Sequence, residues 1–379
     1  MLEAGQDEAA VATVSVQLGR LLFFEGQRDN ALRYTERALE LGERLRLPEV
    51  VSQALNTKAL LLENRPYESL ALMRGALDLA LEHDLGRAAT RGFINLGYLL
   101  WTTGASYQEM ERVFLDGLAY ARRRGDRASE LNFVGQLAGG LFLEGRWDEL
   151  EELAAELPEE ARSRLGDAVA FNMPAFLAQV ARHRGDDESA RALMVDWAAL
   201  KPSADVQVES CRIYAKAVVA MTERRYDEVL RIAREELATA QFPAVVEPSL
   251  ELGSAAAEQL GMVDELAELL QLAEDAPAAL PNSSIAQRAR LRAKLSALRG
   301  SDEPPFAQAV ALLRETGERF WLAATLLEQA EWLVGQGRPD EAAPLLAEAR
   351  ETFERLRAAP WLERLERAEQ ALGVARVPA

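Results

Sequence analysis

The chain has 379 residues, 49% of them hydrophobic, and it carries 43 Lys and Arg against 61 Asp and Glu, so its net charge is −18. This excess of acid opposes attraction to phosphate backbones and to anionic lipid, because those contacts need clustered Lys and Arg. We therefore expect no direct nucleic-acid partner and no membrane partner.

Cysteine use and the first residues both indicate a cytoplasmic protein. The single cysteine, Cys211, excludes an intrachain disulfide framework and is typical of a reducing compartment. Residues 1–5 lack the basic region and apolar run of a signal peptide, and no apolar segment approaches the length of a membrane span. We expect a soluble chain that stays in the cytoplasm.

A short turn, Gly26 to Ala31, recurs along the whole chain. Its copies begin near residues 26, 64, 104, 145, 185, 224, 261, 300 and 337, which are 37 to 41 residues apart. A nearly constant period of this length is the signature of a helical-hairpin solenoid. The sequence thus predicts a single all-α repeat domain over residues 1–379, a superhelix of about nine hairpins closed by a capping helix at 360–373.

Apolar residues on both sides of each turn repeat with the helical period. The helices before the turns, called first helices below, are predicted at 9–25, 48–63, 87–103, 127–144, 166–184, 205–223, 243–260, 281–299 and 318–336. The second helices, which follow the turns, are predicted at 28–46, 66–84, 107–124, 148–164, 187–200, 226–240, 263–275, 304–316 and 339–357. Most turns begin with glycine, which favours the left-handed conformation at a helix end, and Arg224 is the start least suited to it.

A small or short side chain stands seven residues before every turn. The nine residues are Gly19, Thr57, Gly97, Ala138, Ala178, Ala217, Ser254, Ala293 and Ala330. Such residues let the backbones of two crossing helices approach closely, so the pattern predicts tight crossing within each hairpin.

These small positions resemble the tetratricopeptide consensus. Leu18-Gly19 before Gly26, followed by Ala31 and Ala38, carries the resemblance in the first hairpin, and the last hairpin matches it equally well. The period is nearer 39 than 34, and the proline that usually closes the motif is missing. The pattern is therefore similar to the longer helical repeats of bacterial multidomain signalling proteins.

Longer stretches of the sequence resemble a more specific group of proteins. Residues 38–43, 47–50, 54–58 and 80–85, with 353–364 near the end, resemble the C-terminal repeat region of bacterial class III nucleotide cyclase-like and LuxR-type ATPase-containing regulators. In that family the catalytic, nucleotide-binding and DNA-binding domains lie outside the repeats. The resemblance implies a regulatory module without an activity of its own.

The sequence carries no enzyme signature of the kinds sought. No glycine-rich segment ends in Gly-Lys followed by Ser or Thr, as a phosphate-binding P-loop requires. His83 and His183 are one hundred residues apart and Cys211 is remote from both, which is unlike a metal site. Asp186 and Asp187 fit a polar turn and a helix N-cap better than a metal site. We expect no catalytic residue, no cofactor and no metal.

Two charged features leave alternatives open. Acidic residues gather at 144–167 and 258–275, which is typical of a solvated helix face but also compatible with docking of a basic partner. Arg122, Arg123 and Arg124 end a predicted helix, where cations complement the helix dipole better than they indicate phosphate recognition.

The concave face of a tetratricopeptide-like superhelix is lined mostly by first helices, and extended peptides commonly bind there. Transferring the repeat register gives a set of cations, amides and phenols that can bond a peptide backbone or a carboxylate. The set is Arg20, Lys58, Arg91, Tyr98, Asn132, Asn172, Gln179, Arg182 and Tyr214. The alternative is that these are ordinary solvated residues.

The expected function is a non-catalytic scaffold or sensor that binds a protein or peptide in its groove. A small-molecule effector that changes the curvature of the repeat is the second hypothesis. The sequence does not determine the oligomeric state.

Overall fold

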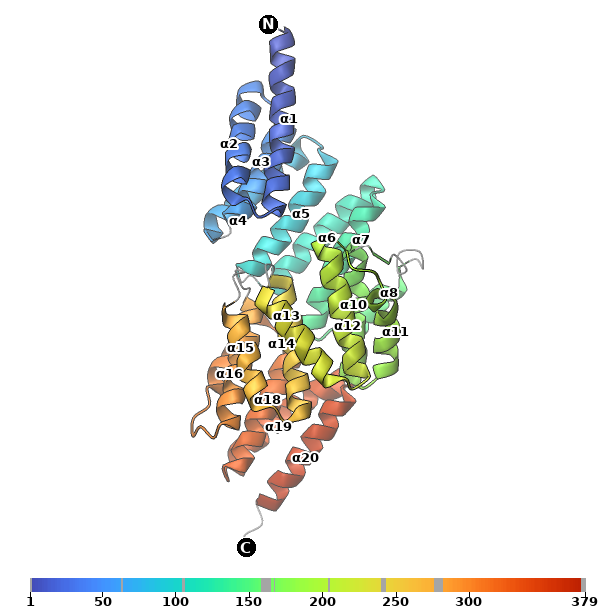
Figure 1. The fold of residues 1–379 in the computed structure, drawn as a ribbon, viewed down its shortest axis with the longest axis vertical. Helices are drawn as coiled ribbons and strands as arrows, with labels where there is room; N and C mark the ends of the chain where they lie inside the picture. The colour runs from blue at the N-terminus through green and yellow to red at the C-terminus, as the bar shows by residue number, and fades with distance from the viewer. Residues whose placement is uncertain are drawn as a thin grey trace. The chain divides into compact units, whose positions relative to one another are not determined.

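The computed structural model describes residues 2–62, 64–103, 106–157, 165–166, 168–203, 205–239, 243–275 and 282–375. These residues form nineteen helices and no strand (Figure 1). The fold is all-α, a helical repeat, as the period of the turns predicts. The chain divides into two compact units, residues 1–133 (unit 1) and 134–379 (unit 2). The single domain expected over 1–379 stays a prediction.

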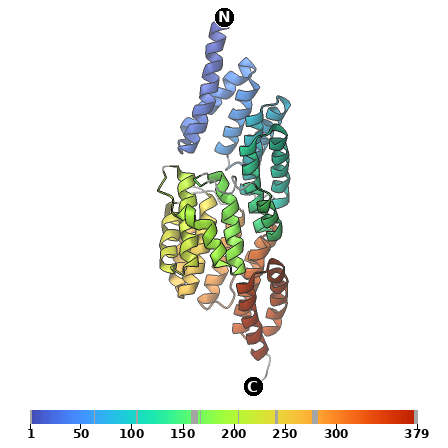
Figure 2. The ribbon, with the colours of Figure 1, turned by 90° about the vertical axis from the view of Figure 1, so that its right-hand side faces the viewer.

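Unit 1 consists of three helical hairpins and the start of a fourth. Its helices are α1 (Leu2–Phe24), α2 (Arg28–Leu45), α3 (Pro48–Leu61), α4 (Pro66–Glu82), α5 (Gly86–Thr102), α6 (Tyr107–Arg124) and the first part of α7 (Arg127–Leu143). Each first helix packs on the second helix that follows it, and α3 also contacts the first helices α1 and α5. Figure 2 shows the helix pairs from a second side.

Unit 2 continues the same pattern. Its helices are the rest of α7, α8 (Trp147–Ala155), α10 (Ala168–Arg184), α11 (Asp187–Ala198), α12 (Val206–Thr222), α13 (Tyr226–Thr239), α14 (Pro243–Leu260), α15 (Val263–Asp275), α16 (Asn282–Leu298), α17 (Phe306–Thr316), α18 (Arg319–Gly335), α19 (Pro339–Leu356) and α20 (Ala359–Ala375). The predicted bounds agree to within a few residues, except that α1 begins earlier than expected. The second helix predicted at 148–164 ends at Ala155, and residues 158–164 lie outside the described residues.

The turns have the backbone conformation that their glycines predict. Positive φ angles occur at Gly26, Gly145, Gly185, Gly261, Gly300 and Gly337, whereas Gly104 lies outside the described residues. Arg224 also adopts the left-handed conformation, with a φ of 57°. For a residue with a side chain this costs about 1–2 kcal/mol, so the repeat geometry imposes the turn even without glycine.

The small residues seven positions before the turns are buried in all nine hairpins. A Cβ atom added to Gly97 would lie 2.2 Å from the Phe114 ring, and one added to Gly19 would lie 2.6 Å from Thr35 Oγ1. Both distances are too short for real contacts, so the predicted tight crossing is confirmed in these hairpins.

Within unit 2, the last helices return to the first. The ring of His183 on α10 lies 4.2 Å from Phe320 and 6.2 Å from Trp361, measured between ring centroids. Arg184 Nε donates a hydrogen bond to the Leu356 carbonyl, 3.0 Å away. Glycines at the turns allow this approach, because a Cβ at Gly185 would lie 3.0 Å from Pro360. The interior of unit 2 is therefore lined by side chains from both ends of the unit.

Candidate functional site

All nine residues of the predicted groove set lie on first helices. In unit 1, Arg20 is on α1, Lys58 on α3, Arg91 and Tyr98 on α5, and Asn132 on α7; in unit 2, Asn172, Gln179 and Arg182 are on α10 and Tyr214 is on α12. The surface formed by α1, α3 and α5 is called the first-helix face of unit 1 below. The predicted residues divide between the two units, and their surroundings differ.

A ladder of polar side chains crosses the first-helix face of unit 1. Gln17 Nε2 on α1 donates to Gln53 Oε1 on α3 at 3.4 Å. Asn95 Nδ2 on α5 donates to Asn56 Oδ1 on α3 at 2.7 Å. Arg91 Nη2 donates to Thr57 Oγ1 at 3.0 Å. These side chains, Gln17, Gln53, Asn56, Thr57, Arg91 and Asn95, are called the polar ladder. They link three consecutive hairpins, and all of them except the donor Arg91 can both donate and accept hydrogen bonds.

Three predicted cations lie on the same helices as the polar ladder, and they differ in their burial and in their partners. Lys58 Nζ forms an ion pair with Glu36 Oε1 at 2.7 Å. Arg20 is exposed, and its guanidinium lies over the Phe24 ring, 5.7 Å from the ring centroid. Arg91 is half-buried and belongs to the ladder itself. Only Lys58 of these three forms an ion pair within the part of the chain that the structure describes.

Arg91 is the least satisfied of the three cations. Its Nη1 atom is buried and has no hydrogen-bond partner among the residues described. Burial, with a smaller contribution from the positive charge of Arg20, lowers the pKa of Arg91 to about 10. Such a cation is costly to hold next to another cation in the absence of an anion.

The other predicted residues of unit 1 are half-buried. The Tyr98 ring lies 6.2 Å from the Trp101 ring, at an angle of 59°. Asn132 lies on α7 with part of its surface accessible. Both residues are polar groups at the margin of the first-helix face.

In unit 2 the predicted residues are enclosed. Gln179 is 8% exposed. Arg182 forms an ion pair with Glu251 of α14, and both side chains are largely buried. Burial and the charge of Glu251 raise the pKa of the Tyr214 phenol, which Arg182 and Gln179 partly offset. Asn172 is half-buried at the start of α10. Hence these first helices direct polar groups toward each other within the unit.

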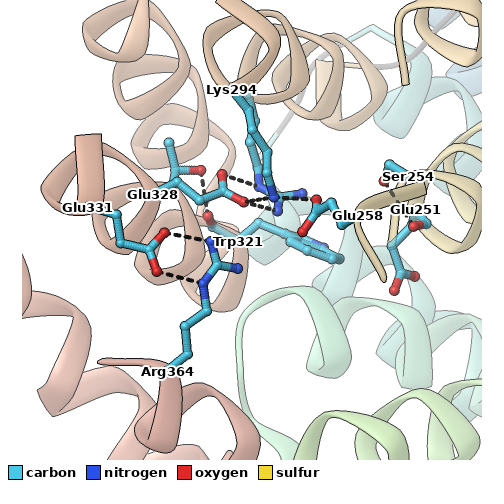
Figure 3. A network of polar contacts seen from close by, with 10 residues as sticks. Glu251, Ser254, Glu258, Lys294, Trp321, Glu328, Glu331 and Arg364 are labelled. Carbon is cyan, nitrogen blue, oxygen red and sulfur yellow. Dashed lines mark hydrogen bonds and ion pairs between the residues drawn. The ribbon is translucent and has the colours of Figure 1, made fainter. Parts of the chain in front are cut away.

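A second polar network, shown in Figure 3, lies deeper in unit 2. Arg290 on α16 donates to both oxygens of Glu328 on α18, from Nη2 at 2.6 Å and from Nε at 3.1 Å. Lys294 Nζ donates to the same carboxylate at 2.9 Å and also pairs with Glu258 of α14. Arg364 of α20 forms a two-bond pair with Glu331 of α18 at 2.6 and 2.7 Å. The network joins four helices that are far apart in sequence.

Burial and charge shift the pKa values of these groups in opposite directions. Burial alone would raise the pKa of Glu328, but the charges of Arg290 and Lys294 hold it below its ordinary value. Burial and the charge of Glu247 raise the pKa of Glu318, against hydrogen bonds from Gln287 and Thr316. Burial lowers the pKa of His183 well below its ordinary value, with contributions from Arg182 and Arg290. Glu328 is therefore held in its charged form, whereas the neutral forms of Glu318 and His183 are favoured.

The described residues form neither a cluster of metal ligands nor an activated cysteine nucleophile. No group of three or more His, Cys, Asp or Glu among the described residues is placed to hold a metal ion. Burial raises the pKa of the Cys211 thiol to about 12, which disfavours the nucleophilic thiolate. Asp186 caps α11, since its side chain accepts a hydrogen bond from the Ser189 amide at 2.9 Å. None of the helices within the described ranges is long and apolar enough to cross a bilayer.

The acidic runs take part in ion pairs within the chain. In the run at 258–275, Glu258 pairs with Lys294, Glu265 and Glu268 pair with Arg234, Glu274 pairs with Arg292, and Asp264 lies 3.9 Å from Arg299. The arginine cluster behaves alike: Arg124 pairs with Asp84, and Arg122 lies 3.9 Å from Glu130. These pairs favour the structural reading of both charged features.

Sequence reasoning missed most of the polar ladder. Asn56 and Asn95 stand eight and nine residues before their turns, and Gln17 also stands nine before its turn. A polar residue at that position of a first helix, where neighbouring residues are apolar, is the signal that could have found them. The sequence around the two buried carboxylates, Glu251 and Glu328, has no comparable pattern that would have identified them.

Comparison of the sequence with protein-family models gives no match, and comparison with curated proteins gives none either. The argument for function therefore rests on the first-helix faces themselves.

Proposed function

We propose that the chain is a non-catalytic helical-repeat scaffold or sensor that binds an extended segment of a partner protein along the first-helix face of unit 1. On this proposal it is the regulatory part of a bacterial signalling or transcription regulator. The supporting observation is the polar ladder, which spans three hairpins and includes exposed or half-exposed amides.

The chemistry of the ladder suits a peptide backbone. An extended peptide presents one N–H and one C=O per residue, and the side-chain amides of Asn and Gln can bond either group. The bond from Asn95 to Asn56 uses one of the two N–H donors of Asn95, and the bond from Gln17 uses one donor of Gln17. Because Asn56 is only 3% exposed, the amides accessible to a ligand laid across α1, α3 and α5 are those of Gln17, Gln53 and Asn95.

Unit 2 offers a poorer surface for this purpose. Gln179 and Arg182 occupy first helices too, but Gln179 is buried and Arg182 forms an enclosed ion pair with Glu251 of α14. A peptide bound there would have to break ion pairs in a desolvated interior, which is strongly unfavourable. The proposal therefore assigns binding to unit 1.

The test is a screen of short synthetic peptides of random sequence against the intact chain, followed by fluorescence anisotropy with the peptides that bind. Gln17→Trp places a bulky side chain on the first-helix face, and Arg37→Trp places the same side chain at an exposed position of the second helix α2. We expect Gln17→Trp to weaken binding by about tenfold or more, which corresponds to about 1.4 kcal/mol. Arg37→Trp should leave binding unchanged. A screen without a binding peptide, or equal effects of the two variants, would refute the proposal.

A further inference from the structure

The side of α1 that α2 and α3 leave uncovered carries a row of apolar side chains. Val14 and Leu21 are 56% and 53% exposed, Val11 is exposed as well, and Leu18 is half-buried. These four residues, called the outer stripe of α1 below, are three or four positions apart and therefore lie on one side of the helix. Single exposed apolar residues are ordinary, whereas a continuous row of them is typical of a surface that binds another chain.

The last described helix, α20, has no such row. None of its described side chains is an exposed large hydrophobic, and its exposed positions include Glu363, Glu366, Arg367 and Gln370. An outer helix of a repeat protein usually has a polar outer face, because no further repeat packs on it. α20 follows this rule and α1 does not.

The outer stripe has the register of a surface that later first helices bury. Val14, Leu18 and Leu21 stand 12, 8 and 5 residues before the turn that begins at residue 26. The residues at the same three positions of α3 and α5 are all buried: Ser52, Asn56, Ala59, Gly92, Leu96 and Leu99. The stripe is therefore the part of a first helix that is normally covered within the repeat.

The second helix of the preceding hairpin covers this surface in α5 and in α7. A Cβ atom added to Gly92, 12 residues before the turn of α5, would lie 3.0 Å from Leu77 of α4. Phe133 stands 12 residues before the turn of α7, and its ring would overlap a Cβ atom added to Gly117 of α6. No described helix takes the corresponding place on α1.

We infer that the outer stripe docks an amphipathic helix of a partner protein, in the place on α1 that α4 takes on α5. Residues 83–85 join α4 to α5, and helices joined by so short a connection run antiparallel. The C-terminal end of the docked helix therefore lies at the N-terminal end of α1, where Asp7 is exposed four residues before Val11. A partner helix with basic residues in its last turn fits this end.

Charge disfavours a second copy of the chain as the occupant. Asp7 and Glu25 are both exposed, and each lies four residues beyond one end of the outer stripe. If two copies of α1 packed antiparallel through their stripes, Asp7 of each copy would face Glu25 of the other. If they packed parallel, each acid would face its own counterpart. Both arrangements place like charges opposite each other at both ends of the contact.

The experiment measures binding of the intact chain to peptides that copy the second helices of unit 1, residues 28–45, 66–82 and 107–124. Asp7 and Glu25 are 18 residues apart, about 27 Å along the helix, and α2 and α6 each have 18 residues, so peptides of this length span the stripe. The peptides are acetylated and amidated, which removes their terminal charges. Fluorescence anisotropy is recorded with the wild type and with Leu21→Asp. Leu298→Asp is the matched control, because Leu298 of α16 is also 53% exposed.

We expect peptide 107–124 to bind more tightly than peptide 66–82. The first ends in three arginines and has 4 Arg against 3 Asp and Glu, a net charge of +1, whereas the second has 1 Arg against 3, a net charge of −2. Leu21→Asp should weaken binding by about tenfold or more, because it places a charge in an apolar contact. Leu298→Asp should leave binding unchanged. Asp7→Lys should reduce the advantage of peptide 107–124 over peptide 66–82.

Val14→Asp repeats the test at a second exposed position of the stripe. The inference is overturned if none of the three peptides binds. It is also overturned if both stripe variants bind the peptides as tightly as the wild type, since a peptide would then have displaced its own copy in the chain. Sedimentation of the chain without peptide tests the rival occupant: an oligomer that Leu21→Asp dissociates would show that a second copy covers the stripe. These outcomes leave the proposed function standing, because that function is tested on the polar ladder with Gln17→Trp.

Discussion

First helices of both units carry buried or half-buried arginines, but these arginines differ in whether they have a carboxylate partner. In unit 1, Arg91 on α5 has no ion pair among the residues described, and its Nη1 atom is buried without a hydrogen-bond partner there. In unit 2, Arg182 of α10 pairs with Glu251 of α14, and Arg290 of α16 pairs with Glu328 of α18. First helices therefore carry an arginine without an ion pair in unit 1 and arginines in buried ion pairs in unit 2.

The difference teaches where the anions come from. Arg182 and Arg290 each find their anion on a later first helix of the same unit, 69 residues away for Arg182 and 38 for Arg290. The return of α20 toward α10 excludes water from this interior, which makes each pair harder to break. In unit 1 the bonds of the polar ladder are made by amides, a hydroxyl and Arg91, with no carboxylate among them.

The largest effect that tests this comparison is expected at Glu328. The variant Glu328→Gln leaves Arg290 buried without its anion, since Arg290 and Glu328 are only 5% and 1% exposed. Removal of one partner of a buried pair costs about 3–5 kcal/mol. Urea unfolding followed by tryptophan fluorescence measures it in a Trp101→Phe background, because the five other tryptophans lie in unit 2.

The matched control for Glu328→Gln is Glu348→Gln. Glu348 pairs with Arg314 at 2.9 Å, but the two side chains are 44% and 55% exposed. An exposed pair contributes about 0–1 kcal/mol, so the control should unfold near the wild-type midpoint. Equal effects of the two variants would contradict the view that the interior of unit 2 is closed.

A second prediction concerns the hairpin crossings of unit 1. In Gly97→Ala the new methyl group would overlap the Phe114 ring, which is 2.2 Å from the ideal Cβ position. We expect a loss of about 1–3 kcal/mol from overpacking. Gly75→Ala in α4 should instead stabilise by about 0.5–1 kcal/mol, because its Cβ meets nothing within 4 Å. Hydrogen exchange of α3, α4 and α5 amides measures both, and a shared sign would show that the crossing is looser than described.

The crossings are also the part of the molecule that the sequence predicts best. Helix bounds follow from the period of the turns, and the small residues at Gly19 and Gly97 follow from the local geometry of a hairpin. Each of these features depends on residues fewer than forty positions apart. The architecture of a repeat protein can therefore be predicted from short-range sequence patterns.

The pairing of inner residues could not be predicted in this way. The repeat register places Arg91 thirteen and Arg182 three residues before their turns, but it does not show that α14 brings Glu251 to Arg182. Nor does it show that α18 and α20 bring Phe320 and Trp361 to His183. These contacts depend on small rotations between hairpins that accumulate along the repeat, and no local pattern encodes their sum.

The third prediction uses pH to probe the closed interior. His183 is surrounded by aromatic rings and Arg182, its Nε2 lies 3.7 Å from Glu251, and burial holds its pKa well below the ordinary value of 6.5. As pH falls below 6.5, the unfolded chain takes up a proton that the folded chain does not. Unit 2 should therefore lose about 1.4 kcal/mol per pH unit from this group until its folded pKa is reached.

The measurement compares urea unfolding at several pH values between wild type and His183→Phe, which keeps an aromatic ring in the cluster. We expect a shallower loss of stability with acid in the variant. His83→Gln controls for removal of a histidine, since His83 is exposed at the end of α4. An unchanged slope in His183→Phe would mean that His183 takes up its proton in the folded state.

The smallest effect is expected at Arg91, and it separates the two units most directly. Arg91→Met removes a half-buried cation that has no ion pair among the described residues, so little attraction is lost and the unfavourable burial of charge is relieved. The lost bond to Thr57 is a single hydrogen bond, and Thr57 still donates to the Gln53 carbonyl at 3.2 Å. We expect a change in stability of less than about 1 kcal/mol in either direction. Hydrogen exchange of the α3 and α5 amides measures it. A loss as large as that for Glu328→Gln would show that Arg91 is a structural cation, whereas near-neutrality together with lost peptide binding would mark it as a residue kept for a ligand.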